Sequence, residues 1–500
     1  MNLSLLLLFP FLSVLGIIPC RGLYQIRWIA FTGALLQLLV SFKLLFQFWN
    51  ERAAGNTSPM LFQSDYVWYS ALNIHFHMGA DGISVAMILL TAFVVLAGIL
   101  ISWKQQDKPK EFFLLLILLS ISAYGFFISL DLFMLFFFLE ISVIPKFLLI
   151  GIWGSGKKEY SAMKLALMLM AGSALVLVGL LGLYFNTSAD NGIHTFDILQ
   201  ISKMNIPVNV QDIFSPFAFA GFGIFAALFP FHTWVPDGHS SAPTAASMFL
   251  AGISMKLGGY GCLRVATYLM PQAAIDYSWI IVLLATIAII YGAFTTMMQK
   301  DLKYINAYSS VSHCGFVLLG IGMLTQTSIT GAVMQMVSHG LMTALFFACI
   351  GMIYDRTHTR EVARLGGILK MMPFISTVFV IAGLCSLGLP GLSGFIAEVT
   401  VFIGSWQRPD TWYRVATILA CASIVVTAVY ILRAVGSVVM GEIPSASFLT
   451  FKDATWNEKM AAGILICGIV AIGVAPFWLY GLITPGTEEI MKNIVQLVVK

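Results

Sequence analysis

Three side chains with carboxylate or amine groups lie inside long apolar stretches of this chain, where a charge is costly. Glu140 lies in the apolar run 132–152, Lys256 in 243–269 and Glu398 in 372–402. On a helix that rises ~1.5 Å per residue, Glu140 is roughly 14 Å and Lys256 roughly 20 Å from the start of its run. Such a group needs a partner or hydration, and a carboxyl group without either stays protonated. The pattern favours proton movement, although a buried Glu can also merely hold helices together.

Two histidines lie at similar depth in neighbouring apolar runs. His313 and His339 are each about ten residues into the runs 303–324 and 329–353. Either could be a hydrogen-bonded core histidine, but an imidazole exchanges its proton near neutral pH. Because the two match in depth and neighbour charged helices, we favour a proton relay.

The stretch 230–244 separates two apolar runs and is the feature around which the chain is organised. It reads Pro-Phe-His-Thr-Trp-Val-Pro-Asp-Gly-His-Ser-Ser-Ala-Pro-Thr and contains His232 and Asp237. We expect a helix to restart at its end, capped by Ser241 and with Pro243 in its first turn.

Two prolines predict interrupted helices. Pro145 follows Glu140 by just over one turn and should kink that helix, which frees the carbonyl of Ile141. The segment Leu387-Gly-Leu-Pro-Gly-Leu-Ser-Gly394 should break a span one turn before Glu398. A broken helix beside a charge is typical of ion sites in transporters.

Three further lysines are candidates. Lys146 follows Pro145, and because six residues turn ~600° on an ideal helix, it points away from Glu140 unless the kink reorients it. Lys164 lies one turn into its run, so a structural lysine that reaches the surface and a functional one remain equally open. Lys303 opens the run of His313, and we group it with Lys164, His232 and Asp237 as supporting residues.

The composition excludes an ordinary soluble protein. Of 500 residues, 59% are hydrophobic and 10% charged, whereas soluble domains have roughly a quarter charged residues. About fourteen apolar runs are long enough to cross a bilayer. We predict an all-α polytopic membrane protein with about fourteen transmembrane helices, two of them broken, at 230–243 and 387–394.

The two predicted breaks lie five runs apart, which suggests two five-helix repeats that are inverted because five is odd. We divide the chain into N-terminal helices at 1–111, a first repeat at 112–270, a second repeat at 271–440, and a last helix with a tail at 441–500.

Basic residues predict the orientation. With the N-terminus outside the cytoplasm, most loop cations, including Lys104, Lys157, Arg356 and Lys452, lie on the cytoplasmic side, as the positive-inside rule requires. We expect both termini on the non-cytoplasmic side of a bacterial inner membrane. The first run lacks a basic region before it and is expected to remain as the first span.

Cofactor signatures are missing from the sequence. The seven cysteines show no paired spacing, and neither a dinucleotide fingerprint nor a P-loop is present. His75 and His77 lie in a polar loop and have no carboxylate ligand grouped with them in the sequence, which favours a solvated surface over a metal site. We expect no flavin, nucleotide or metal in this chain, and no nucleic acid as a partner.

The chain resembles the antiporter-like subunits of respiratory complex I, and among them the M type, because it has no long C-terminal extension. The resemblance covers the third to the thirteenth apolar run. Its specific motifs are Phe138-Leu-Glu140 with Pro145, the 230–244 block, Lys256, Asp301-Leu-Lys303 with Tyr308 to His313, His339-Gly, and Leu389-Pro-Gly391 with Glu398.

This resemblance implies a proton channel in the membrane arm of NADH:quinone oxidoreductase, so the chain would be a non-redox subunit of a proton-translocating enzyme. FMN, iron–sulfur clusters and quinone are implied on partner subunits. The implied partners are membrane-arm neighbours of the L and N types, the peripheral NADH-oxidising arm and the lipid bilayer. Glu140, Lys256 and Glu398 match family residues that line a hydrated axis, with His313 and His339 as links.

One position departs from the family pattern. The family has Lys-x-Pro in the seventh span, but this chain reads Phe225-Ala226-Ala227. Lys146 stands where the family has an apolar or aromatic residue. Our hypothesis is that Lys146 takes over the ammonium role, since a cation within ~4–6 Å keeps a carboxylate ionised. The alternative is a subunit that pumps poorly or not at all.

Two other functions are weighed against this one. A subunit of a multi-subunit cation/proton antiporter or of a membrane-bound hydrogenase would share the fold and most of these residues. A purely structural scaffold is disfavoured because Glu140, Lys256 and Glu398 would each be costly in the membrane.

Overall fold

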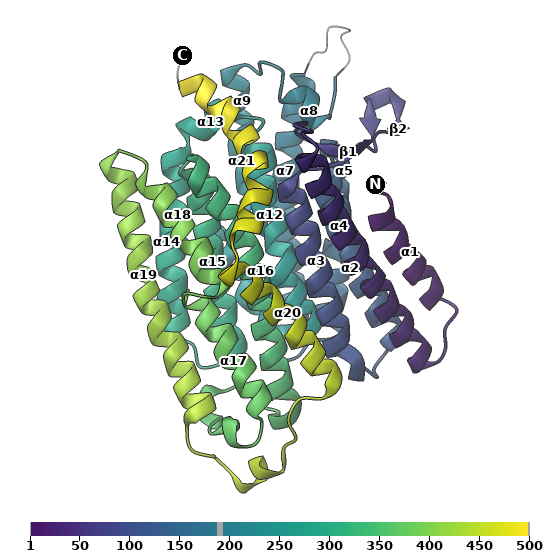
Figure 1. Ribbon diagram of the computed structural model, residues 1–500, viewed down its shortest axis with the longest axis vertical. Coiled ribbons are helices and arrows are strands. Elements are labelled where there is room, and N and C mark those ends of the chain that lie inside the picture. Colours follow the sequence, from purple (N-terminus) through teal and green to yellow (C-terminus); the bar gives the residue numbers. More distant parts are fainter. Residues whose placement is uncertain (1, 188–193, 499–500) are drawn as a thin grey trace.

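The computed structural model describes residues 2–187 and 194–498, and this part of the chain forms a bundle of helices (Figure 1). The only strands in these ranges are two short antiparallel pairs: β1 (Leu61–Ser64) with β4 (Met78–Ala80), and β2 (Val67–Tyr69) with β3 (Ile74–His75). Helix α1 begins and helix α21 ends toward the upper end of the bundle. The prediction of an all-α polytopic membrane protein is confirmed.

The long elements follow the predicted runs in order. They are α1 (Leu5–Ile17), α2 (Leu23–Ala53), α3 (Gly82–Ile101), α4 (Pro109–Ile128), α5 (Leu132–Ile141) with α6 (Val143–Trp153), α7 (Lys158–Phe185), α9 (Val208–Phe225) with α10 (Trp234–Ser241), α11 (Thr244–Phe249) with α12 (Met255–Gly261), α14 (Ser278–Met298), α15 (Leu302–Gly322), α16 (Gln326–Thr357), α17 (Pro373–Ser386) with α18 (Ser393–Trp406), α19 (Thr411–Val435), and α20 (Trp456–Val474) with α21 (Phe477–Val498).

Three π-helical segments and several short elements complete the fold. The π-helices are η4 (Leu250–Ser254), η5 (Cys262–Thr267) and η8 (Gly436–Met440). The short elements are η1 (Ser70–Leu72), η2 (Ser102–Lys104), α8 (Ile198–Ile201), η3 (Phe231–Thr233), α13 (Pro271–Asp276), η6 (Val362–Arg364), η7 (Ile368–Lys370) and η9 (Ala446–Thr450).

Nine of the predicted spans are, among the described residues, helices long and apolar enough to cross a membrane on their own. The remaining five spans are the short α1, the interrupted pairs α9 with α10 and α17 with α18, the π-containing span α11 to η5, and the polar α15. Four of these five carry a candidate site residue, namely Asp237, Lys256, His313 and Glu398. Three of the nine apolar spans also carry candidates, namely Glu140 and Lys146 in α5 with α6, Lys164 in α7 and His339 in α16.

Interruptions occur at more places than predicted. The chain breaks between α17 and α18 and around α10 as expected, and α5 ends at Ile141, as the Pro145 argument requires. A further break at Ala475 and Pro476 divides the last span into α20 and α21. The capping prediction for Ser241 is wrong: Ser241 ends α10, and Pro243 precedes α11 without a side-chain cap. The reason is that a residue before proline avoids the helical region, and Ala242 is extended.

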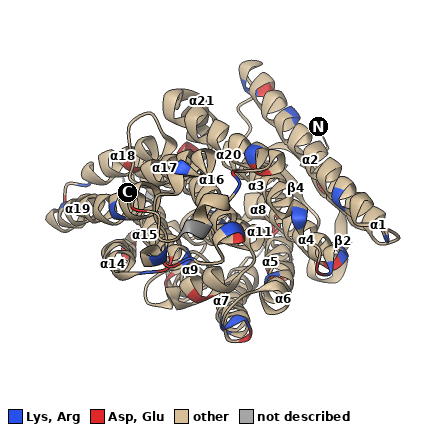
Figure 2. Cartoon of the chain, turned by 90° about the horizontal axis from the view of Figure 1, so that it is seen from below, with Lys and Arg blue, Asp and Glu red and all other residues tan. Residues whose placement is uncertain are grey.

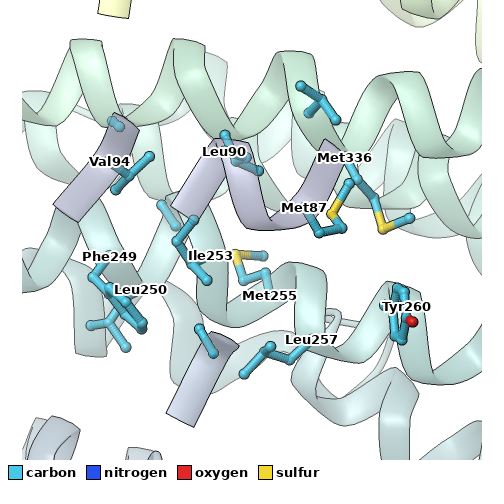
Figure 3. Close-up of a cluster of buried hydrophobic side chains, with 14 of the residues drawn as sticks. Met87, Leu90, Val94, Phe249, Leu250, Ile253, Met255, Leu257, Tyr260 and Met336 are labelled. Carbon is cyan, nitrogen blue, oxygen red and sulfur yellow. The ribbon is translucent and has the colours of Figure 1, made fainter. Parts of the chain in front are cut away.

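Helix α16 forms the centre of the bundle. Its apolar window is entirely buried, and the view from the lower end places α16 and α11 inside a ring that includes α19, α7 and α1, with most of the ribbon uncharged (Figure 2). Apolar side chains of α3, α16 and the eighth span face one another there (Figure 3). The ionisable residues of the eighth span are thus surrounded by core.

The two predicted repeats share an order of elements. The first set of five spans runs from α4 to η5, and its fourth span is interrupted between α9 and α10. The second set runs from α14 to η8, and its fourth span is interrupted between α17 and α18. The first set starts at the lower end of Figure 1 and the second at the upper end, so they run in opposite directions. The numerical domain boundaries remain predictions.

The polar loop at the upper end differs from its prediction as a solvated surface. His77 is 8% exposed, and its Nδ1 lies 2.6 Å from Oδ2 of Asp197. His75 Nδ1 lies 2.8 Å from Oδ1 of Asp65. The sequence alone could not show that Asp197 lies beside His77, because the two residues are far apart along the chain.

Candidate functional site

The break between α17 and α18 positions Glu398. Gly388 and Gly391 have φ of +74° and +94°, which side chains rarely adopt. A Cβ at Gly388 would lie 2.7 Å from Glu398 Oε2, so the carboxylate occupies the room left by this glycine. Glu398 is 4% exposed, and its Oε1 lies 3.3 Å from Nδ1 of His313. The break therefore makes space for a buried carboxylate beside an imidazole.

His313 connects Glu398 with α16. Its Nε2 lies 3.1 Å from the hydroxyl of Ser386, and its Nδ1 lies 3.2 Å from Nε2 of Gln335. The rings of His313 and His339 stack at 5.2 Å between centroids. Gln335, one turn before His339, was missed by sequence reasoning because an uncharged polar residue gives no signal of the face on which it lies.

His339 connects this group with Lys256. The ammonium Nζ of Lys256 lies 2.7 Å from Nδ1 of His339, and both residues are 1% exposed. A charged ammonium can only donate, so Nδ1 accepts and Nε2 carries the proton of a neutral His339 ring. Lys256, His339, His313 and Glu398, from α12, α16, α15 and α18, thus form one buried series, which we call the central axis.

Local backbone features bring the eighth span close to α16. A Cβ at Gly340 would lie 2.8 Å from the carbonyl oxygen of Gly252, so the two helices cross at a pair of glycines. Gly252 lies in the π-helix η4, directly before α12. Wider π turns are common at functional sites because they displace side chains from the regular helical register.

A polar cavity of about 620 Å³ lies at the lower end of the bundle, lined by residues of α7, α10 and α15. Lys164 Nζ donates to Asp237 Oδ2 over 2.7 Å, and the hydroxyl of Tyr304 lies 3.4 Å from Oδ1 of the same carboxylate. The Lys164 and Asp237 side chains are 24% and 25% exposed. Lys164 thus reaches a carboxylate at the cavity wall.

Two cations meet the C-terminal end of α10. Lys303 Nζ donates to the carbonyl of Ala242 over 2.6 Å, and Arg360 donates to the carbonyl of Ser240 over 2.7 Å. Cations are favoured at this end of a helix, where carbonyls are left without helical partners. Lys303 is 5% exposed and belongs to this break, not to the hydrogen-bonded series of the central axis.

The two histidines of the 230–244 block have different surroundings. His232 stacks on Phe229 at 5.6 Å and meets Tyr291 edge-on at 5.0 Å, and its Nδ1 has no hydrogen-bond partner among the described residues. His239 was not selected from the sequence, yet it is fully buried, stacks on Phe347 at 5.4 Å, and neither ring nitrogen has a described partner. Its place in the same polar block as Asp237 was the available signal.

Glu140 and Lys146 lie in one region without forming an ion pair. No oxygen of Glu140 lies within 4.0 Å of the Lys146 ammonium. Lys146 is fully buried, donates to Ser142 Oγ over 2.8 Å, and lies 5.8 Å from the centroid of the Phe225 ring. No described hydrogen bond links either residue to Lys256, so the structure does not join this pair to the central axis.

The seventh span breaks without the proline of the family motif. Helix α9 ends at Phe225 with Ala226 as its C-cap, and Ala227 adopts φ of +61°. The indole of Trp234 donates to the carbonyl of Ile224 over 3.0 Å, and the amide of Leu228 donates to the carbonyl of Gly223 over 2.8 Å. These bonds satisfy carbonyls that a helix end leaves free.

Several buried polar atoms near these residues have no described protein partner. They are Glu140 Oε1, both ring nitrogens of His239, His339 Nε2, Ser254 Oγ and both side-chain polar atoms of Asn306. An unpaired buried polar group costs ~1–3 kcal/mol, so these atoms need hydrogen-bond partners other than the described residues of this chain. No group of three or more His, Cys, Asp or Glu in the described ranges could hold a metal ion.

Comparison with known proteins gives a clear family. The profile described as NADH:quinone oxidoreductase/Mrp antiporter, TM, matches residues 129–427. NADH-quinone oxidoreductase subunit M of Rickettsia bellii is 34% identical over 486 residues, which is 95% of both chains. NAD(P)H-quinone oxidoreductase chain 4-2 of a Synechocystis species is 36% identical over 466 residues, which is 92% of this chain and 82% of the relative.

Solved structures confirm the fold. A chain of respiratory complex I from Thermus thermophilus with bound NADH has a TM-score of 0.88 at 23% identity and covers 98% of this chain and 99% of its own. A chain of the Mrp complex from a Dietzia species has a TM-score of 0.83 at 18% identity, with coverage of 100% and 99%.

Proposed function

We propose a function from one premise: the chain belongs to the NADH:quinone oxidoreductase/Mrp antiporter transmembrane family. The function is that of an M-type membrane-arm subunit, which translocates protons while NADH oxidation and quinone reduction take place on other subunits. Relatives named NADH-quinone oxidoreductase subunit M, matched over nearly their whole length, support this proposal.

The central axis is the observation that carries the proposal. A proton can pass from the Lys256 ammonium to His339, from His339 to His313 and from His313 to the Glu398 carboxylate, because each imidazole has one nitrogen that accepts and one that donates. The contacts of 2.7 Å and 3.3 Å at the ends of this series are close enough for transfer, whereas the stacked histidines need a bridging water or a ring rotation. The buried polar atoms without protein partners support a hydrated path.

The route by which protons would reach the central axis is part of the same proposal. Lys164, Asp237 and Lys303 lie at the lower end, and the basic residues of the loops there support a cytoplasmic assignment of this end. The carbonyl of His239 accepts a hydrogen bond from the hydroxyl of Ser247 over 3.0 Å, so His239 lies at the junction of α10 with the eighth span. We assign the polar cavity to proton uptake and His239 to the passage toward Lys256, with both termini on the non-cytoplasmic side of a bacterial inner membrane.

The surface beside Glu140 points to a neighbouring subunit. Glu140 is only partly buried within this chain, and Phe137 and Ile144, on the same side of the helix, are 42% and 65% exposed. Because a carboxylate facing lipid is costly, we assign this face to a partner in the membrane arm. We also place FMN, iron–sulfur clusters and quinone on partner subunits.

A subunit of a cation/proton antiporter is the second candidate. It is favoured by one observation, the near-equal fold similarity to the Mrp complex chain. Relatives at 33–36% identity over 90% or more of this chain carry quinone oxidoreductase names, which favours the first function.

Co-purification separates the two functions. We expect the tagged full chain, solubilised from its native membrane in mild detergent, to bring down a peripheral arm that oxidises NADH. A complex made only of membrane subunits, without NADH oxidation, would contradict the first function and support the second.

A further inference from the structure

The buried ammonium of Lys146 lies where the seventh span breaks, although the family's lysine is missing there. Its Nζ is 5.8 Å from the ring centroid of Phe225, which is the last residue of α9. An ammonium near an aromatic ring is attracted by the ring's negative face. The partial negative charge at the C-terminal end of the α9 helix dipole also favours a cation. The fold therefore keeps a cation at this break while taking it from a different helix.

Ser142 provides the hydrogen bond that holds this ammonium. The serine lies between α5 and α6, where Pro145 removes a backbone donor. Its Oγ accepts from Lys146 Nζ over 2.8 Å and donates to the carbonyl of Leu139 over 2.6 Å. An ammonium has three N–H donors, and only this one has a described partner. The Ser142 and Phe225 groups, which we call the resting site, thus hold Lys146 by few contacts.

Glu140 lies across the α5–α6 interruption from the resting site. Its Oε1 is buried without a described partner, and the carboxylate is more than 4.0 Å from the Lys146 ammonium. The carboxylate and the ammonium start from positions separated by one helix interruption. A modest rotation at Ser142 would change their separation, and with it the attraction that keeps the carboxylate ionised.

We propose that Lys146 is the charge that controls Glu140 in the first half of the channel, and that it alternates between the resting site and Glu140. With the ammonium at the resting site, the carboxylate accepts a proton from a hydronium ion, so a carboxyl O–H bond forms as a hydronium O–H bond breaks and water is left. When the ammonium approaches, the carboxyl O–H bond breaks and the proton forms hydronium with a water molecule on the other side. This inference rests on the proposed function. It adds that Lys146 supplies the positive charge for which the family uses a seventh-span lysine.

The test uses the whole complex, purified and reconstituted in liposomes, with NADH-driven proton uptake and quinone reduction measured together. Lys146→Met should lower proton pumping by about tenfold, which corresponds to one pKa unit of lost charge interaction. Lys146→Arg should keep most of it, because the charge remains. Ser142→Ala should give an intermediate loss, because it removes only the resting acceptor. Lys108→Met, at an exposed loop position, is the matched control and should match wild type.

The decisive variant moves the amine to the family's position. Lys146→Met combined with Phe225→Lys should recover pumping, a result that a purely structural role of Lys146 does not predict. If Lys146→Met pumps like wild type while Lys256→Met is impaired, the Lys146 proposal is wrong and the proposed function stands. If neither changes pumping, the proposed function itself fails. If the double variant does not assemble, Lys146→Met is compared with Lys146→Arg. Equal losses of proton pumping in these two variants would contradict a role of the Lys146 charge.

Discussion

His313 is the residue on which the second half of the axis depends. It meets Glu398, Gln335 and Ser386 through its two ring nitrogens and His339 through its ring face. Sequence reasoning found this residue and its partners His339 and Glu398 because ionisable groups stand out in apolar runs. It missed Gln335, Ser386 and His239, since the face on which a neutral or loop-adjacent residue lies follows from packing.

The first residue-scale prediction concerns proton transfer through this imidazole. His313→Gln keeps a hydrogen-bonding side chain but cannot carry a proton, so NADH-driven pumping by the reconstituted complex should fall by at least about tenfold. Ser386→Ala removes one hydrogen bond worth roughly 0.5–1.5 kcal/mol and should change pumping little. Equal effects of the two variants would show that His313 is structural.

At the scale of elements, the clearest difference from sequence expectation is that the seventh-span break begins at Ala226, before the predicted start at Pro230. The sequence lacks the family's proline there, so no local signal marks Ala226 and Ala227. The break instead depends on the eighth span: a Cβ at Gly258 would lie 2.5 Å from the carbonyl oxygen of Phe222 and 2.8 Å from the carbonyl carbon of Phe225. By contrast, the 387–394 break was predictable, because Pro390 and its glycines interrupt a helix by themselves.

The element-scale prediction follows from this close approach. Gly258→Ala should destabilise the assembled subunit by ~1–3 kcal/mol, because the backbone of the break must move to admit a methyl group. Gly463→Ala on α20 is the matched control, since a Cβ there has nothing within 4 Å. Thermal unfolding of the purified complex measures both. A Gly258→Ala complex as stable as the control would mean that the break does not need this contact.

At the scale of the whole molecule, a charged cluster ties the upper loops to the bundle. His77 pairs with Asp197, the amide of Leu130 donates to the carbonyl of His77 over 2.9 Å, and Asp131 caps α5. Burial lowers the pKa of His77, but the hydrogen bond to Asp197 and the charges of Asp197, Asp65 and Asp131 outweigh it, so the pKa lies above its usual value. Burial raises the pKa of Asp131 to about 6, against backbone hydrogen bonds that lower it.

Both shifts predict the same dependence of stability on pH. A histidine with a raised folded-state pKa stabilises the fold fully below its unfolded pKa of about 6.5 and loses this contribution as the pH rises through the folded value. The raised pKa of Asp131 acts with the same sign but at lower pH, because its contribution is lost between the usual value of 3.8 and the folded value of about 6. Because of His77, the unfolding temperature of the complex should fall from pH 6 to pH 8, and His77→Gln should flatten this slope. His75→Gln, whose partner Asp65 is half exposed, is the control and should leave the slope unchanged.

The most direct test of the account asks whether protons pass along the central axis. We would measure protons moved per NADH oxidised in proteoliposomes containing the purified complex, for wild type and Lys256→Met. Removing the amine takes away the donor 2.7 Å from His339, so the account predicts a lower ratio in a fully assembled complex. An unchanged ratio, with quinone reduction at the wild-type rate, would contradict proton transfer through Lys256, His339, His313 and Glu398.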